Sequence, residues 1–213
     1  MALRVFGLTG GIGSGKSAAA KRLRERGVPV VNADELARVA VAPGSAGLEQ
    51  ITEYFGPGVL TAAGELDRAE LAKIVFQDAE ARRMLDSMIH PIVRQLAAQR
   101  FQQIGETGEP LACYEVPLLY ENGLDRTYHP VVVVNAPLSL REARLAQRDG
   151  FDSTQIAARI AAQMPLEEKV RRADYVIDNS GTVEELARAT DAVLTALCDA
   201  LALPAGRYAG LSA

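Results

Sequence analysis

Short apolar runs alternate with amphipathic stretches along most of the chain. Five largely apolar runs have the length of strands: residues 3–9, 28–31, 111–116, 131–134 and 175–177. Continuous apolar runs, unlike strict alternation, are typical of strands covered on both faces, as in a parallel sheet between helices. The pattern therefore predicts an α/β fold, with a five-stranded parallel sheet flanked by helices.

The segments between these runs have the start and stop signals of helices. Residues 17–26 are rich in helix formers. A capping residue followed three positions later by glutamate predicts three helix starts, at Asp67, Ser139 and Thr182. The second of these helices should end at Gly150, and the third should run to about Leu201.

One long stretch lacks strand patterns. Between residues 36 and 108, apolar positions at helical spacing dominate, which predicts a helical insertion in the α/β core. Residues 204–213 are mostly small and are expected to form a flexible tail. His90 and His129 each precede a proline, so both are expected in extended or turn conformations.

Composition restricts the class of protein. The chain has 213 residues, enough for one domain with small insertions, and its net charge of -4 argues against a general nucleic-acid binder. Cys113 and Cys198 are far apart in apolar runs, as expected of reduced, buried thiols. The chain shows neither a signal-peptide pattern nor an apolar run of about 20 residues, so we expect a cytoplasmic protein without a membrane partner.

The most specific motif is Gly-Gly-Ile-Gly-Ser-Gly-Lys-Ser at residues 10–17, which matches G-x-x-x-x-G-K-[ST] in full between a predicted strand and a predicted helix. Glycines let backbone N–H groups turn inward around phosphate oxygens, and the helix N-terminus adds positive partial charge. Lys16 is expected to reach the β- and γ-phosphates, and the Ser17 hydroxyl to bind Mg²⁺. The Lys-Ser pair disfavours the alternative, a glycine-rich turn that binds nothing. The motif therefore predicts a nucleoside triphosphate site.

Several classes of phosphate-loop protein are less consistent with the sequence. The Asn-Lys-x-Asp motif typical of GTPases is absent, and the strand at 111–116 carries one acid, Glu115, where motor ATPases usually have a pair. Lys16 stands where the dinucleotide motif G-x-G-x-x-G needs its third glycine. A small-molecule kinase is favoured, with a kinase for another small acceptor and a nucleotide-dependent switch as the alternatives.

A candidate general base follows the second strand run. Ligands of parallel α/β sheets lie beyond the carboxyl ends of the strands, so Asp34 is expected near the phosphates, where its carboxylate could accept a proton from a hydroxyl acceptor. Arg38, four residues later, could hold an acceptor anion. The alternative, in which Asp34 is a helix N-cap and Arg38 a solvated residue, is equally consistent with the sequence.

Basic residues follow the fourth strand run. Arg141, Arg144 and Arg148 share one helical face. Four more follow: Arg159, Lys169, Arg171 and Arg172. Beside a phosphate loop they predict a cationic lid that neutralises the transferring phosphoryl group and excludes water, with a solvated surface helix as the alternative. The loop at residues 178–181 could offer backbone groups to a nucleobase or form a turn before Thr182, and these two roles are compatible with each other.

Taken in order, these motifs resemble those of the dephospho-CoA kinase family over about residues 3–201. The resemblance is carried by residues 8–17, 33–34, 37–38, 90–91, 116–121, 144, 148–149, 161–163, 173–174 and 177–179. It implies a P-loop kinase fold whose nucleotide-binding core comprises residues 1–35, 109–140 and 173–203. It further implies a helical acceptor domain at 36–108 and a lid at 141–172.

The resemblance also implies a reaction. Mg-ATP would phosphorylate the ribose 3'-hydroxyl of dephospho-CoA, giving CoA and ADP in the last step of CoA biosynthesis. Asp34 would be the general base, with Lys16 and Arg144 as further catalytic residues. The implied ATP-binding residues are Gly11, Ile12, Gly13, Ser14, Gly15, Lys16, Ser17, Ala18, Arg148, Asn179 and Gly181. The implied acceptor-binding residues are Asp34, Arg38, His90, Pro117, Leu118 and Leu119. We expect a monomer, with a small homo-oligomer as the alternative.

Three positions depart from the family's common pattern. Asn32 stands where aspartate is usual, Ala18 where threonine is usual, and Glu115 where aspartate is common. These departures remove an acid near the metal and a hydroxyl near the α-phosphate, and could weaken nucleotide or Mg²⁺ affinity. None is expected to abolish activity.

Overall fold

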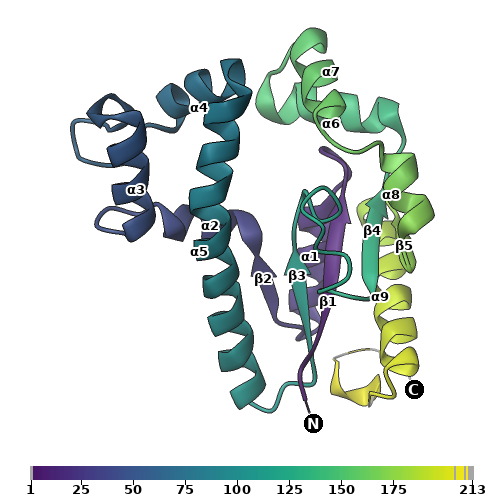
Figure 1. Cartoon of the computed structure of the whole chain (residues 1–213). Helices are drawn as coiled ribbons and strands as arrows, with labels where there is room; N and C mark the ends of the chain where they lie inside the picture. Colours follow the sequence, from purple (N-terminus) through teal and green to yellow (C-terminus); the bar gives the residue numbers. More distant parts are fainter. Residues whose placement is uncertain (1, 204, 209, 211–213) are drawn as a thin grey trace. The chain divides into compact units, whose positions relative to one another are not determined.

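The structure, a computed structural model, describes residues 2–203, 205–208 and 210 and divides into two compact units (Figure 1). The first unit holds the chain up to Val31 and from Ile104 onward, and the second is Asn32–Gln103. The insertion was expected at 36–108. The helical unit instead spans Asn32–Gln103, and its first helix, α2 (Ala33–Ala40), is capped by the Asn32 side chain.

Five strands of the described chain form one sheet in the order β2-β3-β1-β4-β5. Their bounds are β1 Arg4–Gly10, β2 Val30–Asn32, β3 Leu111–Glu115, β4 Val131–Asn135 and β5 Tyr175–Asp178. The central strand β1 pairs in parallel with β3 and β4, and β4 pairs in parallel with β5. The predicted α/β fold with a five-stranded sheet is confirmed. The order places the phosphate loop, which follows β1, at the end of the central strand.

One face of the sheet packs against α1 (Lys16–Glu25) and α9 (Val183–Ala200). Successive side chains of a strand point to opposite faces, so alternate strand residues build this core. From the strands it takes Phe6, Leu8, Leu111, Cys113, Val132, Val134 and Ile177. Cys113 and Cys198 are both buried free thiols, as predicted, and burial raises the pKa of Cys113 well above its ordinary value.

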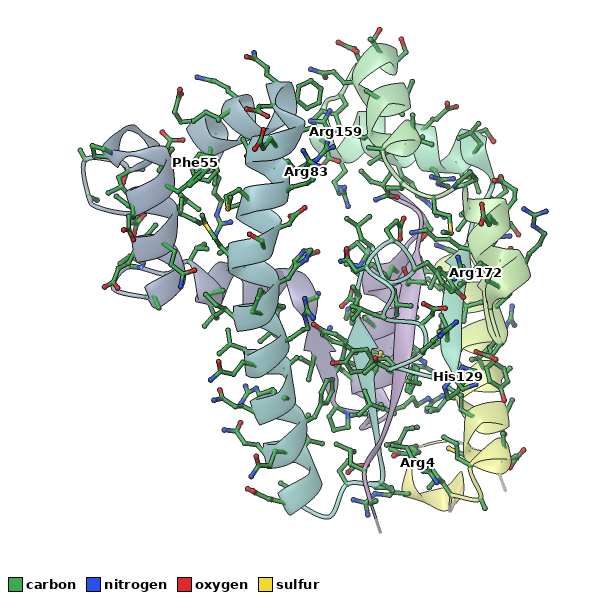
Figure 2. All side chains as sticks on the ribbon, viewed as in Figure 1. Arg4, Phe55, Arg83, His129, Arg159 and Arg172 are labelled. Atoms are coloured by element: carbon green, nitrogen blue, oxygen red, sulfur yellow. The ribbon has the colours of Figure 1, made fainter. Side chains whose placement is uncertain are left out.

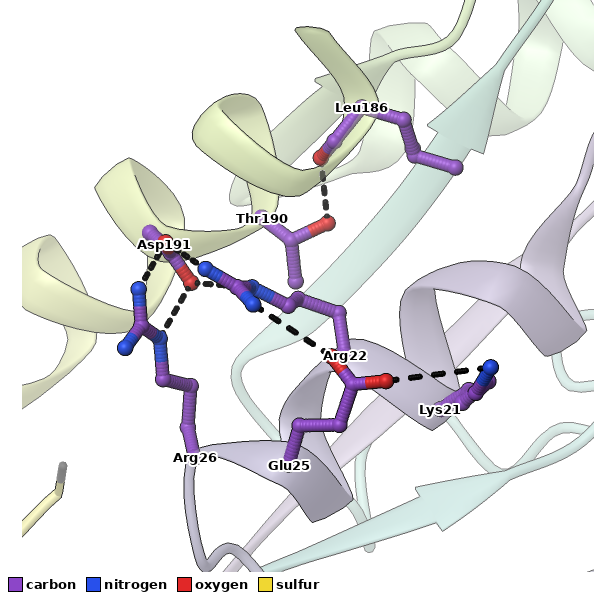
Figure 3. A network of polar contacts seen from close by, with 7 residues as sticks. All are labelled: Lys21, Arg22, Glu25, Arg26, Leu186, Thr190 and Asp191. Carbon is purple, nitrogen blue, oxygen red and sulfur yellow. Dashed lines mark hydrogen bonds and ion pairs between the residues drawn. The ribbon is translucent and has the colours of Figure 1, made fainter. Parts of the chain in front are cut away.

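An ion-pair network joins α1 to α9 at the surface of this core (Figure 3). The Asp191 carboxylate accepts hydrogen bonds from Arg22 Nη2 at 2.7 Å and from Arg26 Nε at 2.9 Å. Burial alone raises the pKa of Asp191, but the hydrogen bonds from the two arginines outweigh it and lower the pKa to about 2. The network therefore stabilises the folded state whenever this carboxyl is ionised.

The opposite face is covered partly by the loop after β3. Helix α8 (Leu166–Arg172) contacts β4, and α6 (Leu138–Asp149) and α7 (Ser153–Ala161) contact each other. The Leu119 side chain is fully buried against Gly7, where a Cβ atom would collide with it. The Tyr114 and Tyr128 rings meet edge to face with centroids 4.6 Å apart.

Two of the three predicted helix starts are confirmed. The side chains of Asp67 and Thr182 cap α4 (Arg68–Gln77) and α9, and the second forms a complete capping box with Glu185. The prediction at Ser139 is wrong, because α6 already begins at Leu138, with Pro137 at the N-cap. Proline's fixed φ suits this position, and Ser139 therefore lies inside the first turn.

The second unit is helical, with α2, α3 (Ala46–Phe55), a short 3₁₀ turn at Pro57–Val59, α4 and the N-terminal part of α5 (Ala79–Glu106). Its core contains Ala40, Val41, Ile51, Val59 and Leu71, packed against apolar residues of α5. His90 was predicted in an extended or turn conformation, which is wrong, since it lies inside α5 next to Pro91. The apolar face of α5 continues on both sides of the proline, so burial outweighs the local preference.

The end of the described chain is packed. Residues Ala205–Arg207 form a 3₁₀ turn, and Tyr208 is 1% exposed and donates a 2.9 Å hydrogen bond to Glu109. The expectation of a flexible tail at 204–213 is therefore wrong for residues 205–208, while 204, 209 and 211–213 lie outside the described residues. No helix in the described part of the chain combines the length and apolarity needed to cross a bilayer.

Candidate active site

The loop between β1 and α1 has the backbone of an anion-binding site. Gly13 and Gly15 adopt positive φ angles of 77° and 92°, which glycine accepts without strain. Gly15 is the N-cap of α1 and has no side chain that could bond the first N–H groups of the helix. The strand–loop–helix arrangement can thus bind an anion at the positive end of α1.

Three successive carbonyl groups of this loop are held by side chains from outside it. Ile12 O accepts from Arg141 Nε at 3.0 Å, Gly13 O from Arg144 Nη1 at 3.4 Å, and Ser14 O from Asn179 Nδ2 at 2.7 Å. The C=O and the following N–H of a trans peptide point in opposite directions. With these carbonyls turned outward, the N–H groups of Gly13 and Gly15 are turned to the inner side of the loop.

A buried carboxylate lies beside the lysine and serine of the motif. Glu115, 1% exposed at the end of β3, accepts from Lys16 Nζ at 2.7 Å and from Ser17 Oγ at 3.4 Å. From the sequence, Glu115 was noted as the lone acid of its strand and as a departure from the family pattern, but it was assigned no catalytic or binding role. A lone acid at the carboxyl end of a strand was the available signal, but its meaning depends on β3 lying next to β1.

This donor set fits Mg²⁺. The Ser17 hydroxyl and the Glu115 carboxylate are hard oxygen ligands, and Mg²⁺ usually takes one or two such protein groups together with phosphate oxygens. A further hydroxyl, Ser14 Oγ, is buried in the loop and has no hydrogen-bond partner within the described chain. The site therefore offers oxygen donors for a metal and a spare polar atom for a ligand.

The basic residues after β4 have different environments. Arg144 also donates to Asn179 O at 3.2 Å, while Arg148 is 67% exposed and pairs with the adjacent Asp149 at 2.7 Å. Arg172 pairs with Asp125 and lies over the Tyr120 ring, and Arg159 lies over the Phe151 ring. Both arginines are labelled in Figure 2. Lys169 is fully buried and pairs with Glu121 at 2.8 Å. Among the basic residues described in this paragraph, Arg144 contacts the phosphate loop directly. Arg141 contacts the same loop.

The loop after β5 supports the phosphate loop. The buried Asn179 side chain bonds Ser14 O and fits closely over Gly15, where a Cβ atom would collide with Nδ2. A Cβ atom at Gly181 would likewise collide with the Glu185 carboxylate, which accepts from the N–H of Thr182. Residues 180 and 181 form a bend before the Thr182 cap. Ala18 lies exposed in the first turn of α1.

The expected acceptor-binding residues occupy both units. In the first unit, Pro117 O accepts from Thr9 Oγ1 at 3.1 Å and from Lys169 Nζ at 3.0 Å, and Leu118 is exposed. Leu119 is completely buried in the core, so the expectation that it lines an acceptor cleft is wrong.

In the second unit, Asp34 and Arg38 are exposed on α2, four residues apart, and His90 lies on α5. The N-cap of α2 is Asn32, whose Oδ1 accepts from the N–H groups of Asp34 and Glu35. The alternative in which Asp34 is the cap is therefore wrong. Asn32, a departure from the family pattern, has a capping role, and the Asp34 side chain makes no hydrogen bond or ion pair with the described residues.

Comparison with known proteins identifies the family. The family model for dephospho-CoA kinase matches residues 4–185. The chain belongs to the dephospho-CoA kinase family. Among curated dephospho-CoA kinases, that of Anaeromyxobacter dehalogenans is 48% identical over 92% of each chain. That of Gloeobacter violaceus is 49% identical over 87% of this chain and 89% of its own.

Solved structures agree with this assignment. TT1252 from Thermus thermophilus is 38% identical, with a TM-score of 0.81 over 92% of this chain and 99% of its own. Dephospho-CoA kinase from Campylobacter jejuni is 26% identical, with a TM-score of 0.69 over 92% and 97%. Shikimate kinase from Acinetobacter baumannii is 14% identical with a TM-score of 0.54, a likeness of fold alone. The range matched by the dephospho-CoA kinase model contains the phosphate loop, Asp34, Glu115 and Asn179.

Proposed function

We propose that this protein transfers the γ-phosphoryl group of ATP to the ribose 3'-hydroxyl of dephospho-CoA, giving CoA and ADP, the last step of CoA biosynthesis. One observation carries the proposal. A phosphate loop with Lys16, Ser17 and Glu115 gathered at its helix N-terminus occurs in a chain of the dephospho-CoA kinase family. The loop accounts for phosphate binding, and membership of the family indicates which molecule accepts the phosphoryl group.

Each residue has a chemical task in this reaction. The inward N–H groups of the loop bind phosphate oxygens, and Lys16 neutralises charge on the β- and γ-phosphates. Ser17 and Glu115 would hold Mg²⁺, which neutralises further phosphate charge when bound. Asp34 accepts the proton of the acceptor hydroxyl, which makes the oxygen a better nucleophile for in-line transfer. Arg144, with no carboxylate at ion-pair distance among the described residues, stabilises charge on the transferring group.

The remaining expectations belong to the same proposal. The helical second unit binds the CoA precursor, with Arg38 and His90 as contacts, and residues 141–172 act as a lid carrying Arg148. The nucleobase of ATP lies near the loop that contains Asn179 and Gly181. We propose that the protein works as a cytoplasmic monomer.

Acceptor-dependent ADP release tests the proposal. Mg-ATP is supplied alone, with dephospho-CoA, or with AMP, shikimate or gluconate, and Lys16→Ala serves as the variant that should lose nucleotide binding. We expect stimulation by dephospho-CoA alone. Stimulation by another acceptor would contradict the assigned substrate, and ADP release indifferent to every acceptor would favour a hydrolytic switch.

A further inference from the structure

Both backbone polar groups of Ile12 are bound by side chains. Its N–H donates to Gln163 Oε1 at 2.9 Å, and its C=O accepts from Arg141 Nε at 3.0 Å. Arg141 lies on α6, and Gln163 lies in the turn between α7 and α8. The N–H belongs to the Gly11–Ile12 peptide and the C=O to the Ile12–Gly13 peptide, so two side chains far apart in sequence hold two adjacent peptide planes of the phosphate loop.

The Arg141 residue packs closely against the phosphate loop. Its side chain is 4% exposed and forms no ion pair with the described residues, which is unusual for a buried guanidinium. A Cβ atom at Gly11 would lie 2.8 Å from Arg141 Nη2, and one at Gly13 would lie 2.8 Å from Arg141 O. The glycines of the motif thus make room for Arg141 on the outer side of the loop, as well as for phosphate on the inner side.

Gln163 comes from an anchored turn. The N–H of Met164, the next residue, donates to Glu121 Oε1 at 2.9 Å. The same carboxylate oxygen pairs with the fully buried Lys169 at 2.8 Å, and Lys169 also donates to Pro117 O at 3.0 Å. An ion pair to a fully buried lysine, with further hydrogen bonds, fixes its members, so the backbone that carries Gln163 is held in place before any ligand binds.

We propose that Arg141 and Gln163 are positioning residues that together clamp the two peptide planes flanking Ile12 and preset the phosphate loop for the β- and γ-phosphates of a nucleotide. Neither is required to touch the nucleotide. The Ile12 C=O and the Gly13 N–H share one planar trans peptide, so the Arg141 bond to that C=O keeps the Gly13 N–H turned inward. The Gln163 bond to the Ile12 N–H holds the preceding peptide plane. Ordering the loop before binding lowers the entropic cost of capturing the ligand. This inference rests on the proposed function of the loop as a nucleotide site.

Amide hydrogen exchange at Ile12 in the ligand-free protein tests the clamp directly. Gln163→Met removes the acceptor at similar length, Gln163→Glu keeps an acceptor oxygen, and Gln147→Met changes an exposed glutamine on α6 as a control. We expect Ile12 exchange to be about tenfold faster in Gln163→Met, and to match wild type in the other two variants. Equal Ile12 exchange in wild type and Gln163→Met would overturn the proposal.

The affinity for MgADP, measured by calorimetry without acceptor, gives the second readout. We expect the dissociation constant to rise about three- to tenfold in Gln163→Met and Arg141→Met, and less in Arg141→Lys, which keeps a donor for Ile12 O. The KM for ATP should rise while kcat stays within about twofold. An unchanged MgADP affinity in both methionine variants would overturn the clamp. Failure of the wild type to form CoA, with these binding results intact, would overturn only the proposed function.

Discussion

Asp191 provides a stability prediction whose size follows from the structure. Replacing it with asparagine leaves Arg22 and Arg26 without their shared anion. Its pKa falls from 3.8 to about 2 on folding, which corresponds to roughly 2 kcal/mol of stability at neutral pH, allowing for solvent screening at a partly exposed site. A lowered carboxyl pKa stabilises the fold above the unfolded pKa. This contribution is lost as the pH falls through the folded pKa.

Urea unfolding at several pH values measures this contribution. Asp191→Asn should be less stable than wild type by roughly 2 kcal/mol between pH 5 and 7, and the gap should narrow to about half at pH 3. Asp199→Asn, which changes an exposed carboxylate on the same helix, is the matched control and should stay within about 0.5 kcal/mol of wild type. A gap between wild type and Asp191→Asn that is constant from pH 7 to pH 3 would refute the reasoning, because the ionised carboxylate would then not be its source.

Three further substitutions test the site and the fold. Asp34→Asn should keep ATP affinity and lower kcat by about 100-fold or more, with Glu35→Gln near wild type in the same ADP-release assay; turnover within a few-fold of wild type would remove the base assignment. Glu115→Gln should lower kcat about tenfold and raise the Mg²⁺ concentration needed for half-maximal rate, and an unchanged Mg²⁺ titration would count against a metal-binding role. Tyr208→Phe should destabilise the protein by about 1 kcal/mol in urea, since it removes the 2.9 Å bond to Glu109, whereas equal stability would argue against the packed terminus.

The parts of the fold that depend on local sequence could be predicted. Unbroken apolar runs define the strands of a buried parallel sheet, and the phosphate loop carries its own chemistry in eight consecutive residues. The His90–Pro91 prediction failed because a local preference competes with burial along the whole of α5, and burial is the larger effect. Similarly, Tyr208 follows small residues, yet it has a place in the core that only the folded chain provides.

The missed site contacts all join segments that are distant in sequence. Glu115 becomes a partner of Lys16 because β3 lies next to β1, a strand order that the apolar pattern does not contain. Helical spacing placed Arg141 on the same face as Arg144. It could not show that Arg141 is buried and donates a hydrogen bond to the Ile12 carbonyl of the phosphate loop. Leu119 was expected at a cleft because of its motif, and only the close approach to Gly7 shows that it belongs to the core.

Identification of the phosphorylated product tests the central claim most directly. The protein is incubated with dephospho-CoA and ATP labelled in the γ-phosphate, and the product is analysed by mass spectrometry and ³¹P NMR. We expect one labelled phosphate, carried by the ribose 3'-oxygen, with one ADP formed per product. Label recovered as inorganic phosphate, or attached at any other position, would contradict it.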